Sequence, residues 1–310
     1  MPRDRNPQRD QMADESMMRN LALQARAIWP QEAPLFRRYA LPPAARILDV
    51  GCGTGEIASR LAADLPGATV VGVDVLEASV AIARSRHAAL APRLSFVEGD
   101  AYALAFPDAS FDLVVCRHVL QSIPAPERVV AELRRVARPG GWLHLILEDY
   151  GLLHASPASP ALEAFWERVP RAFGTAIGID NFVGRHGLAL LRGVGILDIH
   201  HDDVVVDTLR VPRDVVAGII EAWRGVHRGP RAPCGDSGRR RPGRLRGDAL
   251  GDPRSGRLLR LARPGVERAG SRGVEVTAAP GRDRDRGRGI GAPRAGHCAA
   301  WTVDGFRRDR

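Results

Sequence analysis

The residues best suited to chemistry are a glycine-rich loop and three aspartates that accompany it. The loop, Gly51–Gly55 (GCGTG), directly follows an apolar run that ends at Val50. Glycine lets such a turn adopt positive φ and lets a ligand approach the backbone, and free amides at a following helix start can donate hydrogen bonds. Asp49 precedes the loop, Asp74 ends the next apolar run, and Asp100 follows a third. The pattern predicts a ligand site.

The elements that must position these residues alternate between short apolar runs and segments with helical spacing. The strand-like runs are Arg46–Val50, Ala68–Val73, Leu94–Val97, Phe111–Cys116 and Trp142–Leu147, and the helical segments between them include Glu56–Leu65, Glu77–Ala89 and Pro126–Arg138. This alternation is typical of a parallel sheet with helices on both faces. We predict an α/β fold with a doubly wound, mainly parallel sheet, whose ligands bind at the carboxyl ends of the strands.

The loop, the aspartates and two later motifs together resemble the class I S-adenosylmethionine-dependent methyltransferases, of the small-molecule type found in bacteria. The later motifs are Phe111–Val115 (FDLVV) and Arg135–Leu143 (RVARPGGWL). The resemblance is dense over Ala45–Glu148 and loose over Met12–Leu209. It implies an enzyme that binds S-adenosylmethionine and transfers its methyl group to a small-molecule acceptor.

The resemblance also implies roles around the methionine and ribose portions of that cofactor. Asp49 would lie near the methionine ammonium. Asp74 would accept hydrogen bonds from both ribose hydroxyls, since one carboxylate can serve a vicinal diol. The loop residues expected against these portions are Gly51, Cys52, Gly53 and Gly55.

For the adenine, the resemblance implies that Val75 packs on the ring face. Asp100 would accept from the exocyclic amine, with the Ala101 amide at a ring nitrogen. Cys116 and Arg117, which end the fourth predicted strand, would face the methionine portion.

A nicotinamide dinucleotide is the competing ligand, because such enzymes also place an acid at the end of the second strand. Their fingerprint, GxGxxG, needs a glycine three residues after Gly53, where this chain has Glu56. A carboxylate there would oppose a pyrophosphate. The spacing therefore favours methyl transfer over hydride transfer.

Two histidines are candidates for a catalytic base. Methyl transfer from a sulfonium relies mainly on in-line positioning in a dry site, although a hydroxyl acceptor often needs a base as well. His118 follows the fourth predicted strand and His154 follows the fifth. His118 fits an ordinary helix start equally well.

Segments on either side of the core are expected to cover the acceptor. Residues 1–44 are expected to form a helical lid around a helix at Met12–Trp29, followed by the cofactor-binding domain over residues 45–224. An insertion at Tyr150–Gly178, rich in aromatic residues, would overhang the same side. The acceptor is expected to be a small molecule rather than nucleic acid, because residues 1–224 carry 24 Arg against 27 acids and offer no basic groove.

The last 86 residues differ sharply in composition. From Gly225 to Arg310 the chain has 21 Arg against 9 acids, and Gly, Pro and Arg make up 45 of the 86 residues. Such a segment cannot bury enough surface to fold, so we predict a disordered basic tail. The break falls inside a helix, and only one of two expected closing antiparallel strands, Ile196–Leu209, is visible. These features predict a frame-shifted translation, with a genuine basic RNA-binding arm as the alternative. For the function, the alternatives are a nucleic-acid methyltransferase that uses the Arg-rich tail, or a cofactor-binding but catalytically impaired chain with a damaged C-terminus.

Cysteine usage and hydropathy set the expected compartment. The four cysteines are widely spaced and form no CxxC pair, which favours a reducing cytoplasm and no zinc site.

The run His200–Asp203 (HHDD) is read as a solvated strand end rather than a metal site, because neighbouring strand residues point to opposite faces. No apolar stretch is long enough to span a membrane. Neither a metal nor a membrane is predicted, and no oligomeric state is defined.

Overall fold

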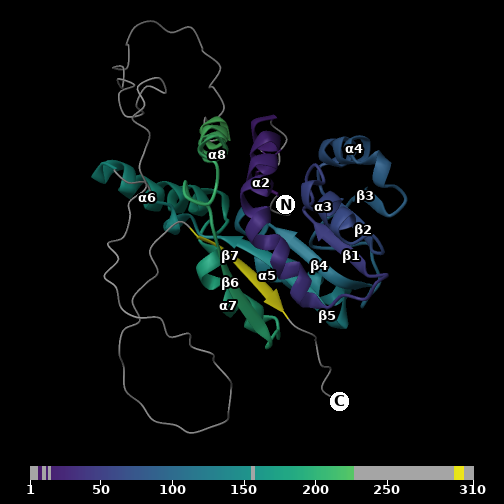
Figure 1. Ribbon diagram of the computed structural model, residues 1–310. Coiled ribbons are helices and arrows are strands. Elements are labelled where there is room, and N and C mark those ends of the chain that lie inside the picture. The colour runs from purple at the N-terminus through teal and green to yellow at the C-terminus, as the bar shows by residue number, and fades with distance from the viewer. Residues whose placement is uncertain (1–5, 9–11, 13–14, 155–157, 227–296, 304–310) are drawn as a thin grey trace, which may run out of the picture.

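A computed structural model describes residues 6–8, 12, 15–154, 158–226 and 297–303. Its centre is a seven-stranded sheet of order β3-β2-β1-β4-β5-β7-β6 (Figure 1). β3, β2, β1, β4 and β5 pair in parallel, while β7 runs antiparallel to both of its neighbours. The strands are β1 (Arg46–Val50), β2 (Thr69–Asp74), β3 (Leu94–Glu98), β4 (Phe111–Arg117), β5 (Ala137–Glu148), β6 (Ile199–Val205) and β7 (His297–Val303).

Helices cover both faces of the sheet, as the alternation in the sequence predicts. They are α2 (Glu15–Phe36), α3 (Glu56–Asp64), α4 (Glu77–Arg86), α5 (Pro126–Val136), α6 (Pro160–Ile177), α7 (Val183–Gly193) and α8 (Arg213–Val226). Short 3-10 turns occur at η1 (Arg37–Tyr39), η2 (Ala88–Leu90), η3 (Leu120–Ser122) and η4 (Tyr150–Leu152). The doubly wound α/β class is confirmed.

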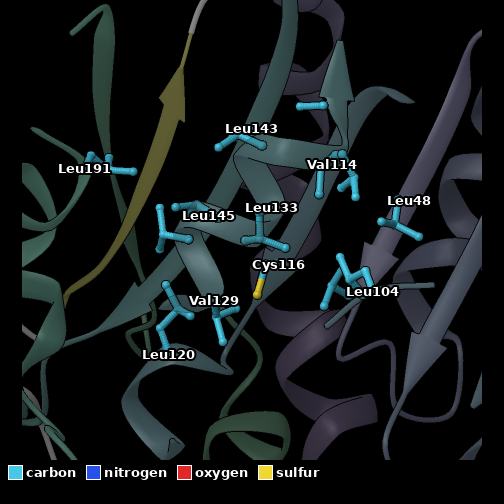
Figure 2. Packing of buried hydrophobic residues seen from close by; sticks show 14 of the residues in the cluster. Leu48, Leu104, Val114, Cys116, Leu120, Val129, Leu133, Leu143, Leu145 and Leu191 are labelled. Atoms are coloured by element: carbon cyan, nitrogen blue, oxygen red, sulfur yellow. The ribbon is translucent and has the colours of Figure 1, made fainter. Parts of the chain in front are cut away.

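The two-residue period of the strands divides the core into two layers. On one face, Leu48 of β1 and Leu145 of β5 join Leu133 of α5 and Leu191 of α7 in one buried cluster (Figure 2). On the other face, Ile47 packs with residues of α2, α3 and α4. Because neighbours along a strand point to opposite faces, Asp49 lies on the face of α2 and α3.

The N-terminal helix is longer than the predicted Met12–Trp29, since α2 continues through Pro30 and Pro34 to Phe36. It packs between α3 and α8 (Figure 1) and also contacts β6. Its buried face includes Ile28 and Leu35, but also the polar Gln24 and Glu32. The predicted insertion contains α6, which begins after the Ser159 cap and passes Pro170.

The strand β7 differs from the prediction that residues 225–310 form a disordered basic tail. His297–Val303 lies between β5 and β6, with Trp301 opposite both Leu145 and His201. The prediction failed there because averaging over 86 residues concealed a short run without Gly, Pro or Arg, rich in residues that favour strands. Residues 227–296 and 304–310 lie outside the described residues, so disorder and a frame shift remain predictions for them.

Within the described ranges, no helix is long and apolar enough to cross a bilayer. The same residues contain no group of three or more His, Cys, Asp or Glu side chains arranged to hold a metal ion. In β6, His200 and His201 are exposed and lie near different carboxylates, those of Asp198 and Asp203.

Candidate functional site

A cavity of about 290 Å³ opens at the carboxyl edge of the parallel strands. Its walls come from the glycine loop after β1, the turns that follow β2, β3 and β4, and the N-terminal segment. The lining residues that carry the argument are Leu21, Gly51, Gly53, Asp74, Asp100 and His118. A second cavity of about 40 Å³ lies beside the first and shares Leu21, Gly51, Gly53, Arg117 and His118 with it. The predicted ligand edge is therefore hollow.

The glycine loop is held against β2 by its own backbone. The amides of Gly51 and Cys52 both donate to the Val73 carbonyl, at 2.8 and 3.0 Å. Gly51 has φ +73° and Gly53 has φ +52°, values at which a side chain is strained. A Cβ at Gly53 would also lie 3.1 Å from Leu21 Cδ1, on the wall of the cavity. Small residues keep this wall open.

Gly55 has a different role from the one implied. It has φ +83° at the start of α3, and its Cα faces the rings of Phe96 and His87, where a Cβ would have no room. It is not among the residues that line either cavity. Gly55 thus shapes the turn into α3, and its place beside the cofactor stays a prediction.

Asp74 and Asp100 both line the larger cavity, together with their neighbours Val75 and Ala101. Asp74 Oδ2 accepts from the Gly53 amide at 2.8 Å, and Oδ1 accepts from the Leu76 amide at 2.9 Å. Burial raises the pKa of Asp74, and these amides oppose that shift. Asp100 Oδ1 accepts from the Tyr102 amide at 2.9 Å. Backbone amides thus fix both carboxylates at the edge of the cavity.

Asp49 lies beneath the glycine loop, 3% exposed, and lines the smaller cavity. Burial raises its pKa to about 7, although the nearby Arg117 guanidinium opposes the shift. Its Oδ2 atom has no hydrogen-bond partner among the described residues. A buried, unpaired carboxylate oxygen of this kind would be stabilised by a cationic or hydrogen-bond-donating ligand.

The two cysteines expected at the ligand do not reach the larger cavity. Cys116 is buried in the core beneath α5 (Figure 2) and lines neither cavity. Strand alternation explains the difference, because it turns Arg117 toward the cavity and Cys116 away from it. Cys52 lines only the smaller cavity and packs in the opposite core layer. Burial raises the pKa of both thiols well above the ordinary value.

Arg117 belongs to a buried polar chain that ties α2 and η1 to the sheet. Its Nε lies 2.7 Å from Glu32 Oε1, and His144 Nε2 lies 2.9 Å from the same oxygen. His144 Nδ1 in turn contacts the Tyr39 hydroxyl at 2.5 Å. Although burial raises the pKa of Glu32, the Arg117 cation and His144 lower it below its usual value. Arg117 Nη2, also buried, has no hydrogen-bond partner in the described part of the chain.

His118 lines both cavities, and its side chain is 8% exposed. Its Nδ1 lies 2.7 Å from Glu148 Oε1. Glu148 also accepts from Gln24 Nε2 at 3.3 Å and from Gln121 Nε2 at 3.2 Å. Burial raises the pKa of Glu148, but His118, Tyr150 and Arg117 together outweigh this effect, and the net shift is downward. His154, the other candidate base, is exposed and lines neither cavity.

Sequence reasoning placed Glu148 at the rim of the site but missed Glu32, His144 and the two glutamine partners of Glu148. Two signals were present. Glu32 follows Ile28 by four residues and precedes Leu35 by three, so a charge interrupts an apolar helix face. His144 similarly interrupts an apolar strand run. Neither signal identifies its partner, because His144 lies 112 residues from Glu32 and 105 residues from Tyr39 in the chain.

The order of the strands, the glycine loop after β1 and the acids after β2 and β3 are similar to those of the class I S-adenosylmethionine-dependent methyltransferases. Comparison with known proteins agrees, since residues 48–145 match the family described as a methyltransferase domain. The chain is 32% identical over 187 residues to a sterol 24-C-methyltransferase of Gibberella zeae, covering 58% of this chain and 46% of the relative. It is 43% identical over 103 residues to a demethylmenaquinone methyltransferase of Thermus thermophilus, covering 33% and 46%.

Among solved structures, the chain is similar to phosphoethanolamine N-methyltransferase 2 of Haemonchus contortus. The TM-score is 0.51 at 18% identity, over 70% of this chain and 55% of the other. This likeness concerns the fold alone. The chain spans about half the length of the curated relatives it matches.

Proposed function

We propose that this protein transfers a methyl group from S-adenosylmethionine to a small-molecule acceptor. The observation that carries the proposal is the placement of Asp74 and Asp100 on one cavity beside the glycine loop. Relatives named for a sterol and for demethylmenaquinone support a small-molecule acceptor. The resemblance to such enzymes and the geometry of the cavity lead to the same class of reaction.

The residues present fit the methyl donor along its length. Each Asp74 oxygen already accepts one backbone amide, and each keeps a lone pair for a ribose hydroxyl. Asp100 and the Ala101 amide would serve the adenine. Two buried atoms without partners in the described residues, Asp49 Oδ2 and Arg117 Nη2, have the charges that an ammonium and a carboxylate would match. A methionine moiety carries both of those groups.

When bound, the donor supplies a methyl group on a sulfonium, already activated for nucleophilic attack. The chain would then contribute position and a dry environment. Leu21 of α2, Val119 and Ile123 line the cavity with apolar surface, which limits the water near the reacting groups. Gly51 and Gly53, which carry no Cβ, allow a ligand to approach the backbone closely.

Isothermal titration calorimetry tests the proposal. S-adenosylmethionine and S-adenosylhomocysteine should both bind with one-to-one stoichiometry, whereas NAD should give no heat, because Glu56 stands at the helix start where a pyrophosphate would lie. Binding of NAD, with no heat of binding from S-adenosylmethionine or S-adenosylhomocysteine, would refute the proposed function.

A further inference from the structure

We propose that the methyl donor displaces a proton from Asp49 when it binds, so that a ligand needs an ammonium group to bring this carboxylate into its charged form. The exchange, which rests on the proposed function, makes Asp49 a residue that determines ligand specificity. The resemblance implies only that Asp49 lies near the methionine ammonium. The proton exchange follows from the way in which the carboxylate is buried.

The Asp49 side chain is enclosed beneath the glycine loop. The residue is 3% exposed and lies in the layer of α2 and α3. One backbone amide, that of Ala58 in α3, favours its charged form, while Oδ2 has no hydrogen-bond partner among the described residues. A carboxylate buried in this way loses its hydration without replacing it. It therefore holds a proton more readily than a carboxylate in water.

The charged groups around Asp49 include no uncommitted counter-ion within the described structure. Arg117 of β4 favours the charged form of Asp49, but its Nε already lies 2.7 Å from Glu32 Oε1 of α2. Glu32 itself and Asp74 of β2 are like charges that oppose ionisation. Burial, the largest effect, therefore prevails and raises the pKa of Asp49 to about 7.

Four further titratable side chains lie near Asp49 or line the same small cavity: Cys52, Cys116, Glu56 and His118. Burial raises the pKa of both thiols well above the ordinary value, so they stay neutral near pH 7. Glu56 pairs with Arg86 at 2.6 Å, and His118 Nδ1 lies 2.7 Å from Glu148 Oε1. Within the described ranges, Asp49 is thus the carboxyl group of this cavity that has no ion-pair partner.

An ammonium group supplies the charge that Asp49 lacks. Asp49 and Arg117 line the small cavity together, which suits a ligand group that carries both an ammonium and a carboxylate. A cation within about 4–6 Å lowers the pKa of a carboxyl group by about 1 to 3. The O–H bond of the Asp49 carboxyl group then breaks and its proton passes to the solvent, while the ammonium keeps its own protons.

Calorimetry in phosphate and in Tris counts the protons released, because the two buffers differ widely in their heat of ionisation. The ligands are S-adenosylhomocysteine, whose ammonium is its one cationic group, and 5′-methylthioadenosine, which lacks the amino acid portion. At pH 7 the full chain should release about half a proton more with S-adenosylhomocysteine, since about half of the Asp49 carboxyl groups are protonated there. Groups that contact the nucleoside contribute equally with both ligands.

The affinity should follow the same proton. Between pH 6 and pH 8, the affinity for S-adenosylhomocysteine relative to 5′-methylthioadenosine should rise about fivefold to tenfold in the wild type. Asp49→Asn, which cannot ionise, should remove both the extra proton and this rise. Asp64→Asn, at the exposed end of α3, should keep both.

Equal proton release with the two ligands in the wild type would overturn the inference and leave the proposed function standing. Undiminished release from Asp49→Asn with S-adenosylhomocysteine would do the same. Each comparison is decisive by itself, so the inference stays testable if 5′-methylthioadenosine, or S-adenosylhomocysteine in the variant, binds too weakly to measure. Failure of the wild type to bind S-adenosylhomocysteine would remove both the inference and the proposed function.

Discussion

At the scale of single residues, folding shifts the pKa values of the buried acids in the site in different directions. Burial raises the pKa of Asp49 to about 7, while Glu32 and Glu148, which are equally enclosed but have cationic or histidine partners, have lowered pKa values. The difference lies in the partners. Asp49 keeps an oxygen without a hydrogen bond in the described structure, which is a cost that a bound ligand would remove.

Asp49 should therefore make the free protein less stable at high pH. Because its pKa is raised by folding, the native state binds more protons than the unfolded state between about pH 4 and 7, and stability falls as pH rises through that window. Asp49→Asn should increase the free energy of unfolding by about 4 kcal/mol at pH 8, with the difference shrinking toward pH 4. Urea unfolding at both pH values measures it.

Asp64→Asn, an exposed change at the end of α3, is the matched control and should show no such pH dependence. Asp49→Asn should also bind S-adenosylmethionine more weakly than wild type. If Asp49→Asn changed the free energy of unfolding equally at pH 4 and pH 8, the charge of Asp49 would not be what destabilises the free protein.

At the scale of elements, α2 is part of the site as well as of the core. It supplies Leu21 to the cavity wall, Gln24 to Glu148, and Glu32 to Arg117. Glu32 is fully buried and its oxygen serves both Arg117 and His144. The buried Glu32–Arg117 ion pair thus joins α2, the helix of the predicted lid, to the sheet. The same pair positions Arg117, which lines the cavity.

Glu32→Gln should destabilise the protein by about 3–5 kcal/mol, because it leaves the buried Arg117 guanidinium without its counter-charge. Glu77→Gln, at the exposed first turn of α4, should change the free energy of unfolding by less than about 0.5 kcal/mol. Chemical denaturation of both variants provides the comparison. Equal stability of Glu32→Gln and wild type would mean that the Glu32–Arg117 ion pair does not help to hold α2 on the sheet.

At the scale of the whole molecule, the sheet is completed by residues far along the chain. β7 pairs with β5 from Leu143 to Glu148 and with β6 from Ile199 to Val205. Glu148, the partner of His118, lies on the strand that β7 borders. The C-terminal segment therefore supports the same strand that carries part of the site.

A chain that ends after Val226 should be less stable than the full chain and prone to association, because β5 and β6 would each expose an unpaired edge. A chain that ends after Val303 keeps β7 and is the control. Urea unfolding and light scattering compare the two. If the shorter chain matched the control in both measurements, β7 would have no structural role.

Sequence patterns predicted those parts that depend on local spacing. The positions of Asp49, Asp74 and Asp100 followed from strand ends, since one parallel sheet brings such ends to one edge. The pairing of His118 with Glu148 and of Arg117 with Glu32 did not follow, because it depends on how α2 and β5 pack. β7 was missed for a related reason, since its partners β5 and β6 lie far from it in sequence and local composition concealed it.

The most direct test of the proposed cofactor site is calorimetry of Asp74→Ala with S-adenosylmethionine. Asp74 presents both carboxylate oxygens at the cavity through backbone amides, and hydrogen bonds to a charged acceptor contribute about 1.5–3 kcal/mol. Asp74→Ala should therefore weaken binding by about tenfold to a hundredfold, while the exposed control Asp64→Ala binds as wild type. Unchanged affinity in a folded Asp74→Ala protein would contradict this account.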